Sequence, residues 1–113
     1  MPHCIVEFSN SLIDNVSPDE MMKTVYQATL DTDFFEPATI KVRAASYLYT
    51  MGMAERFIHV TAKILSGRTT EQKMELSNLI LQRLQCLPFS AVELSVDIVD
   101  MEKKTYGKGK CHG

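Results

Sequence analysis

The stretch RFIHVTAKILSGRTTEQK, residues 56–73, contains a complete transition from a strand to a helix. In its first half, apolar and polar residues alternate, which predicts a strand with one buried face. A Ser-Gly-Arg turn follows, and Thr69 with Gln72 three residues later has the pattern of a capping box at a helix start. The next apolar residues recur at helical spacing and stop before Pro88. The stretch therefore predicts a strand, a tight turn and an amphipathic helix.

The first half of the chain follows the same plan. PHCIVEFS, residues 2–9, and TIKVRAASYLY, residues 39–49, both predict strands. Between them, Ser17 is the expected N-cap of a helix over about residues 18–30, with Glu20 completing a second capping box. The expected buried stripe of this helix consists of Met22, Val25 and Thr29.

AVELSVDIV, residues 91–99, predicts the last strand, and a Lys- and Gly-rich tail ends the chain. The capped helix starts are 52 residues apart, so the order is that of two βαβ units, about residues 1–52 and 53–113, in one domain. Right-handed units with parallel strands place both helices on one face of a four-stranded sheet, an α+β fold. The other face is left uncovered, which predicts an oligomer.

Composition narrows the possible function classes. The chain has 113 residues, 45% of them hydrophobic and 23% charged, and a net charge of -2, which argues against nucleic-acid binding through a general basic surface. The three cysteines form no CxxC pair, so neither a disulfide framework nor a thiolate zinc site is expected. No apolar run approaches a membrane span and no leader pattern opens the chain, so we expect a cytoplasmic protein without membrane contact.

Pro2, directly behind Met1, is ambiguous. If Met1 stays, Pro2 is an ordinary first strand residue whose missing N–H costs nothing. If Met1 is removed, Pro2 carries a free secondary amine at the start of a buried strand and is able to act as a general base.

Two segments carry a family resemblance. ILSGRTTEQK, followed about 30 residues later by DMEKKTYGKG, resembles the small 4-oxalocrotonate tautomerases. PHCIVEFS, IKVRA and FIHVTAKILSGR resemble the 5-carboxymethyl-2-hydroxymuconate isomerases, relatives with two βαβ units in one chain. The resemblance implies a homotrimer with active sites at subunit boundaries, where the amino-terminal proline moves a proton within an unsaturated 2-hydroxy or 2-oxo acid from aromatic catabolism. It implies no cofactor and no metal.

A proline amine that works as a base at neutral pH needs a lowered pKa, and burial and neighbouring cations both lower it. Lys41 and Arg43 share one strand face, and Arg68 lies in the turn before the second helix. The expected site is therefore Pro2 as base and Arg68 as catalytic cation, with Lys41 or Arg43 binding an anionic substrate. The resemblance adds Tyr106 as an aromatic wall of the pocket.

The sequence departs from the family pattern at three positions. Lys41 stands where the muconate isomerases carry an arginine, Ser95 stands where the small tautomerase has one, and Cys4 replaces a bulky apolar residue. These changes leave the substrate open. They also leave open a proline-dependent hydratase or dehalogenase, and a non-catalytic trimeric interaction protein.

Overall fold

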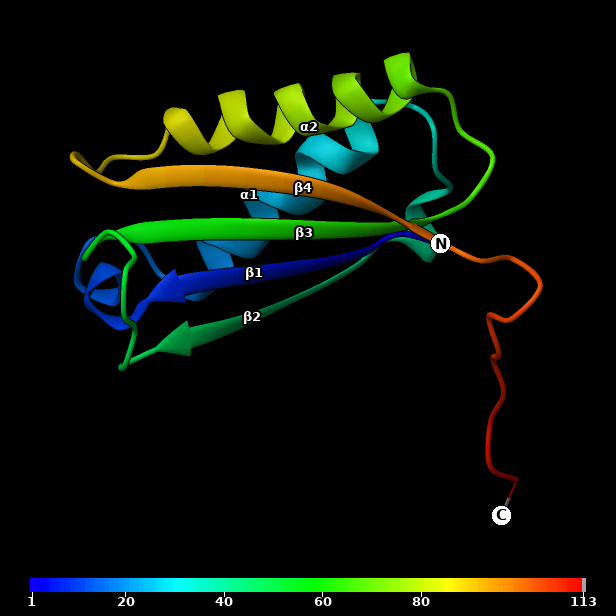
Figure 1. Ribbon diagram of the computed structural model, residues 1–113, viewed down its shortest axis with the longest axis horizontal. Coiled ribbons are helices and arrows are strands. Elements are labelled where there is room, and N and C mark those ends of the chain that lie inside the picture. The colour runs from blue at the N-terminus through cyan, green and yellow to red at the C-terminus, as the bar shows by residue number, and fades with distance from the viewer. Residues whose placement is uncertain (113) are drawn as a thin grey trace.

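The computed structural model describes residues 1–112, in which a four-stranded sheet is covered on one side by two helices (Figure 1). The first unit consists of β1 (His3–Ser9), α1 (Pro18–Asp31) and β2 (Lys41–Tyr47). The second consists of β3 (Phe57–Leu65), α2 (Thr70–Gln85) and β4 (Glu93–Met101). Two short 3-10 helices, η1 (Asn10–Asp14) and η2 (Pro37–Thr39), lie in the first unit. The expected α+β fold with two βαβ units is confirmed.

The strand order is β2-β1-β3-β4. Strands are parallel within each unit, and β1 runs antiparallel to β3, with His3 opposite Lys63 and Phe8 opposite Ile58. The starts of β1 and β2 therefore lie at the same end of the sheet as the ends of β3 and β4. Figure 1 shows the N-terminus at this end, beside the place where the C-terminal tail leaves β4. We call it the amino end of the sheet.

The core lies between the sheet and the helices, because alternate strand residues point toward them. It is formed by Cys4, Val6 and Phe8 of β1, by Ile58, Val60, Ala62 and Ile64 of β3, and by the buried faces of α1 and α2. Leu76, Ile80 and Leu84 of α2 are buried as expected. In α1, however, the buried methionine is Met21 rather than Met22, because α1 presents Met21, Val25, Ala28 and Thr29 to the sheet.

Both predicted helix caps form, although not equally. Thr69 accepts a hydrogen bond from the Gln72 amide at 3.1 Å, and the Gln72 side chain accepts one from the Thr69 amide at 3.0 Å. At α1, the Ser17 hydroxyl accepts from the Glu20 amide at 3.1 Å. Only this half of the box forms among the contacts of α1, all of whose residues the structure describes.

The boundaries of two predicted strands are corrected. The strand predicted over residues 39–49 spans only Lys41–Tyr47, since residues Pro37–Thr39 form η2. The last strand begins at Glu93 rather than Ala91, because Ala91 has a φ of 56°, which is incompatible with an extended strand. The segment after β1 forms η1, and Leu12 and Val16 are buried there and close one end of the core. Within residues 1–112, no helix is both long enough and apolar enough to cross a membrane.

Candidate functional site

The topology brings four of the five predicted site positions to the amino end of the sheet. Pro2 precedes β1 and Lys41 begins β2, while Arg68 and Tyr106 follow the ends of β3 and β4. Arg43 lies two residues further along β2, on the same face as Lys41. Residues far apart in the sequence thus lie at one end of the sheet, because β1 of the first parallel pair runs antiparallel to β3 of the second.

A cavity of about 350 Å³ opens at this end. It is lined by Met1, Phe35, Leu65, Ser66, Gly67, Arg68, Gln72 and Lys103. Met1 and Arg68 therefore share one cavity, and Lys103 adds a cation that the sequence patterns did not single out. The side chains that line the cavity include two cations, Arg68 and Lys103, and no carboxylate. This charge balance favours an anionic ligand.

Arg68 is held by its neighbours. Gly67 before it has a φ of 117°, a left-handed conformation that favours glycine, and Thr69 after it caps α2. One Nη of Arg68 donates to the Phe34 carbonyl at 2.7 Å, and the guanidinium carbon lies 4.5 Å from the ring centroid of Phe35. Because a guanidinium has five N–H donors, the contact with Phe34 leaves most of them for a ligand. Part of the Arg68 guanidinium is thus used to hold its own position.

Pro2 is buried, and its carbonyl accepts a hydrogen bond from the Lys41 amide at 3.0 Å. The sheet ladder between β1 and β2 therefore extends to Pro2. Burial lowers the pKa of the adjacent Met1 amino group below its ordinary value, and the positive charges of Arg68, Lys41 and Lys108 lower it further. The start of the chain thus lies in surroundings that penalise a protonated amine.

Arg43 and Tyr106 are connected through His3, the first residue of β1. The His3 Nε2 lies 2.8 Å from the Tyr106 hydroxyl, and its Nδ1 lies 3.4 Å from an Nη of Arg43. His3 was not among the predicted site residues. Two features of the sequence could have indicated it. His3 directly follows Pro2, and strand alternation places it on the same sheet face as Lys41.

The other positions singled out in the sequence lie elsewhere. Cys4 points into the core, where its Sγ lies 3.7 Å from Thr29 Oγ1 and burial raises the pKa of the thiol. Ser95 lies toward the opposite end of the sheet, with its Oγ 2.6 Å from His59 Nδ1. Neither lines the cavity at the amino end, and no group of three or more potential metal ligands occurs in the described part of the chain.

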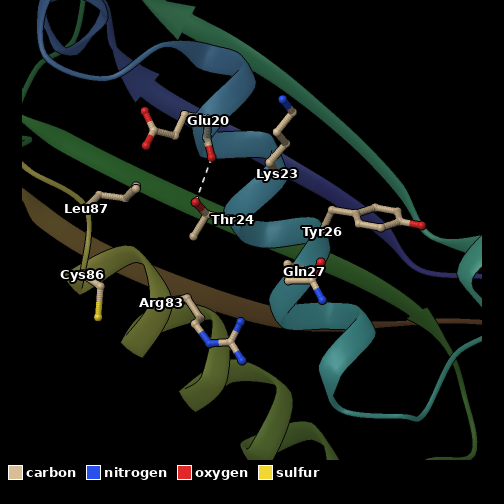
Figure 2. A pocket seen from close by; sticks show the side chains of 8 residues that line it. All are labelled: Glu20, Lys23, Thr24, Tyr26, Gln27, Arg83, Cys86 and Leu87. Carbon is tan, nitrogen blue, oxygen red and sulfur yellow. Dashed lines mark hydrogen bonds between the residues drawn. The ribbon is translucent and has the colours of Figure 1, made fainter.

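A larger hollow of about 500 Å³ lies between α1 and the end of α2 (Figure 2). Its lining includes Lys23, Gln27 and Arg83 but none of the predicted site residues. Arg83 and Gln27 are already bonded to the Asp31 carboxylate, at 2.7 Å and 2.8 Å. The hollow is therefore a separate surface feature of the helix layer.

Comparisons with known proteins identify the family and the fold. Residues 2–112 match the family model of 5-carboxymethyl-2-hydroxymuconate isomerase. The fold is similar to a 5-carboxymethyl-2-hydroxymuconate isomerase from Deinococcus radiodurans R1, with a TM-score of 0.79, 23% identity, and coverage of 97% of this chain and 90% of that one. A comparison with curated proteins gives no significant match.

Two further solved structures share the fold. One is described as a fused 4-OT wild-type symmetric trimer, with a TM-score of 0.76, 17% identity, and coverage of 94% of this chain and 90% of that one. The other is N1, a member of the cis-3-chloroacrylic acid dehalogenase family, with a TM-score of 0.66, 22% identity, and coverage of 96% and 81%. At these identities the likeness establishes the fold.

Proposed function

Because this chain belongs to the 5-carboxymethyl-2-hydroxymuconate isomerase family and is an isomerase, we propose that it is a cofactor-free tautomerase that uses Pro2 as its proton carrier. Its substrate is an unsaturated 2-hydroxy or 2-oxo dicarboxylate of the kind produced by aromatic ring cleavage. Removal of Met1 converts the Pro2 nitrogen from an amide into a secondary amine.

In the proposed reaction, the neutral Pro2 amine takes the proton of the 2-hydroxyl group and becomes an ammonium. The electrons of that O–H bond form the carbonyl, the conjugated double bonds shift, and the distant carbon takes a proton back from the ammonium. The keto product and the neutral amine result, so no proton or electron is gained or lost. Arg68 binds a carboxylate in this scheme, and Lys41 or Arg43 stabilises the negative charge on the dienolate oxygen.

The observation that carries this proposal is the environment of the chain start. Burial and the charges of Arg68 and Lys41 already lower the pKa of the amine that stands one residue before Pro2. The same groups would act on a Pro2 amine, and a neutral base at physiological pH requires that direction of shift.

We also propose a homotrimer, as the family resemblance implies, and a location in the cytoplasm, as the sequence pattern led us to expect. The sheet face turned away from the helices offers the surface for it, and one structurally similar protein is a symmetric trimer.

A proline-dependent dehalogenase or hydratase is the second candidate, favoured by the structural likeness to a member of the cis-3-chloroacrylic acid dehalogenase family. Both reactions would use the same amine and cations, so a side-by-side assay of dienol acids and halogenated acrylates separates them. A non-catalytic interaction protein is disfavoured, because membership in an isomerase family indicates catalysis.

The test combines mass and rate. Intact-mass measurement of the purified protein should find Met1 absent, and enol-to-keto conversion of 2-hydroxymuconate-type acids should be followed by ultraviolet absorbance. Pro2→Ala should lower kcat/KM by about a hundredfold or more, since general base catalysis contributes at least that factor. Full activity of Pro2→Ala, or an active protein that retains Met1, would contradict the proposal.

A further inference from the structure

His3 links two residues of the site that lie far apart in the sequence. Its imidazole lies between the Tyr106 hydroxyl, 2.8 Å from Nε2, and the Arg43 guanidinium, 3.4 Å from Nδ1. The His3 and Tyr106 ring centroids are 6.0 Å apart, with the rings tilted at 57°. A hydrogen bond next to Pro2 therefore joins the start of β1 to the tail that follows β4.

The chemistry of Arg43 decides where the proton of the His3 ring lies. A guanidinium has only N–H donors, so the His3 Nδ1 has to be the acceptor in its contact with Arg43. A neutral imidazole with a bare Nδ1 carries its proton on Nε2. The Nε2–H then donates to the Tyr106 oxygen, and the hydrogen of the Tyr106 hydroxyl is left to donate to another group.

This assignment requires a neutral His3 ring. Burial lowers the pKa of His3 from its ordinary value of 6.5, and nearby positive charges lower it further, so the ring is neutral at pH 7 and above. The titratable and charged groups that act on His3 or contact it are Lys41 and Arg43 of β2, Lys63 of β3, the Met1 amino group and Tyr106 of the tail.

We infer that His3 is a positioning residue: Arg43 fixes its tautomer, and its Nε2–H orients the Tyr106 hydroxyl as a hydrogen-bond donor to the substrate oxygen that becomes negatively charged. The inference rests on the proposed function. It changes the role of Tyr106 from an aromatic wall to a donor, and it gives Arg43 a task different from that of Lys41. A preorganised donor of this kind stabilises an oxyanion more in the transition state than in the ground state.

The first test measures the tautomer directly and needs no turnover. In uniformly ¹⁵N-labelled protein at pH 7.5, two-bond ¹H–¹⁵N correlations distinguish a protonated from a bare ring nitrogen, and His3→Gln assigns the signals. We expect a protonated Nε2 and a bare Nδ1. A protonated Nδ1 would overturn the inference, whatever the enzyme assays give.

The second test measures coupling in kcat. Tyr106→Phe and His3→Ala should each lower kcat about fivefold, the effect of one ordinary hydrogen bond, and the double variant should be no worse than either single one. His3→Gln, whose amide reaches the Nε2 position, should recover part of the loss and remove any acid-side inflection due to His3. His59→Ala is the matched control, because His59 lies on the same sheet face and contacts Ser95 instead.

Additive losses in the double variant, or wild-type kcat in His3→Ala, would overturn the inference. If Pro2→Ala is inactive while His3→Ala is normal, the proposed function stands and this inference fails. If Pro2→Ala is fully active, the proposed function fails, and the tautomer measurement still decides the His3–Tyr106 contact.

Discussion

The two ends of the sheet are built by the same backbone plan but carry opposite chemistry. The amino end gathers Lys41, Arg68 and Lys103 around the start of the chain. At the opposite end, where β1 and β2 finish and β3 and β4 begin, a hollow of about 260 Å³ is lined by Glu7, Tyr47, Met53, Phe57 and His59, with almost entirely apolar surface. The two βαβ units therefore place different side chains at the two ends of the sheet.

The proposed function accounts for this difference. Pro2 precedes β1 and gains a free amine once Met1 is removed, whereas the residue before β3 is Arg56, whose nitrogen is always an amide. The proposed reaction needs cations beside an amine that must stay neutral and an anion that must be bound. The opposite end lacks the amine, and a carboxylate of Glu7 lies there, bonded to the Tyr47 hydroxyl.

Among the cations, the largest effect is expected from removing Arg68. Arg68→Ala should lower kcat/KM about a hundredfold, because the charge-assisted contact of its guanidinium with the substrate carboxylate is lost. The control is Arg56, a cation at the opposite end, where one Nη donates to Asn15 Oδ1 at 3.4 Å. Arg56→Ala should leave kcat/KM unchanged. Steady-state kinetics on both variants makes the comparison, and equal losses would mean that the two ends are not functionally distinct.

A smaller effect is expected from Lys41, and it concerns pH. The positive charge of Lys41 contributes to lowering the pKa of the amine at the chain start, so Lys41→Gln should raise that pKa. Because the base works only when neutral, the acidic limb of the pH profile of kcat/KM should move to higher pH.

Lys41→Arg retains the charge and serves as the control for this shift, and Glu93→Gln tests the far end of the sheet. If the acidic limb stays in place in Lys41→Gln, or moves equally in Glu93→Gln, the charge of Lys41 does not specifically lower the pKa of the base.

The smallest effect compares the two helix caps. Thr69→Ala and Ser17→Ala should each lower the free energy of unfolding by about 1 kcal/mol, measured by urea denaturation. Thr69 directly follows Arg68, so its loss should also lower kcat/KM about fivefold through misplacement of the guanidinium. Ser17 lies at the other end of the fold, and its replacement should leave kcat/KM unchanged.

The elements were predictable where a local pattern specifies them. Alternation in β3 and the capping box of Thr69 and Gln72 gave one complete strand-turn-helix segment correctly. Two methionines in succession left the phase of α1 ambiguous, and only packing against the sheet selects Met21. The left-handed backbone of Ala91, which delays β4, has no signal in its side chain.

The placement of the candidate residues was predictable in part. The family resemblance and the strand pattern put Pro2, Lys41 and Arg68 at one end of the sheet, and the charges of Lys41 and Arg68 lower the pKa of the Met1 amine there. Their roles stay a prediction. The contact of His3 with Tyr106 joins residues 103 positions apart, and it depends on how the tail turns back after β4. A main-chain hydrogen bond of 3.1 Å from the Tyr106 amide to the Glu102 carbonyl stabilises that turn. No periodic pattern in the sequence predicts it.

The hydrogen bond from the Lys41 amide to the Pro2 carbonyl makes the pairing of β1 and β2 independent of whether Met1 is removed. Because that bond uses the carbonyl side of Pro2, an aminopeptidase is able to cut the preceding peptide bond without altering the pairing of the first two strands. Processed and unprocessed molecules would then melt at nearly the same temperature and give the same circular dichroism spectrum. Under the proposed mechanism, a preparation therefore looks uniform by every folding criterion while only the trimmed fraction turns over substrate.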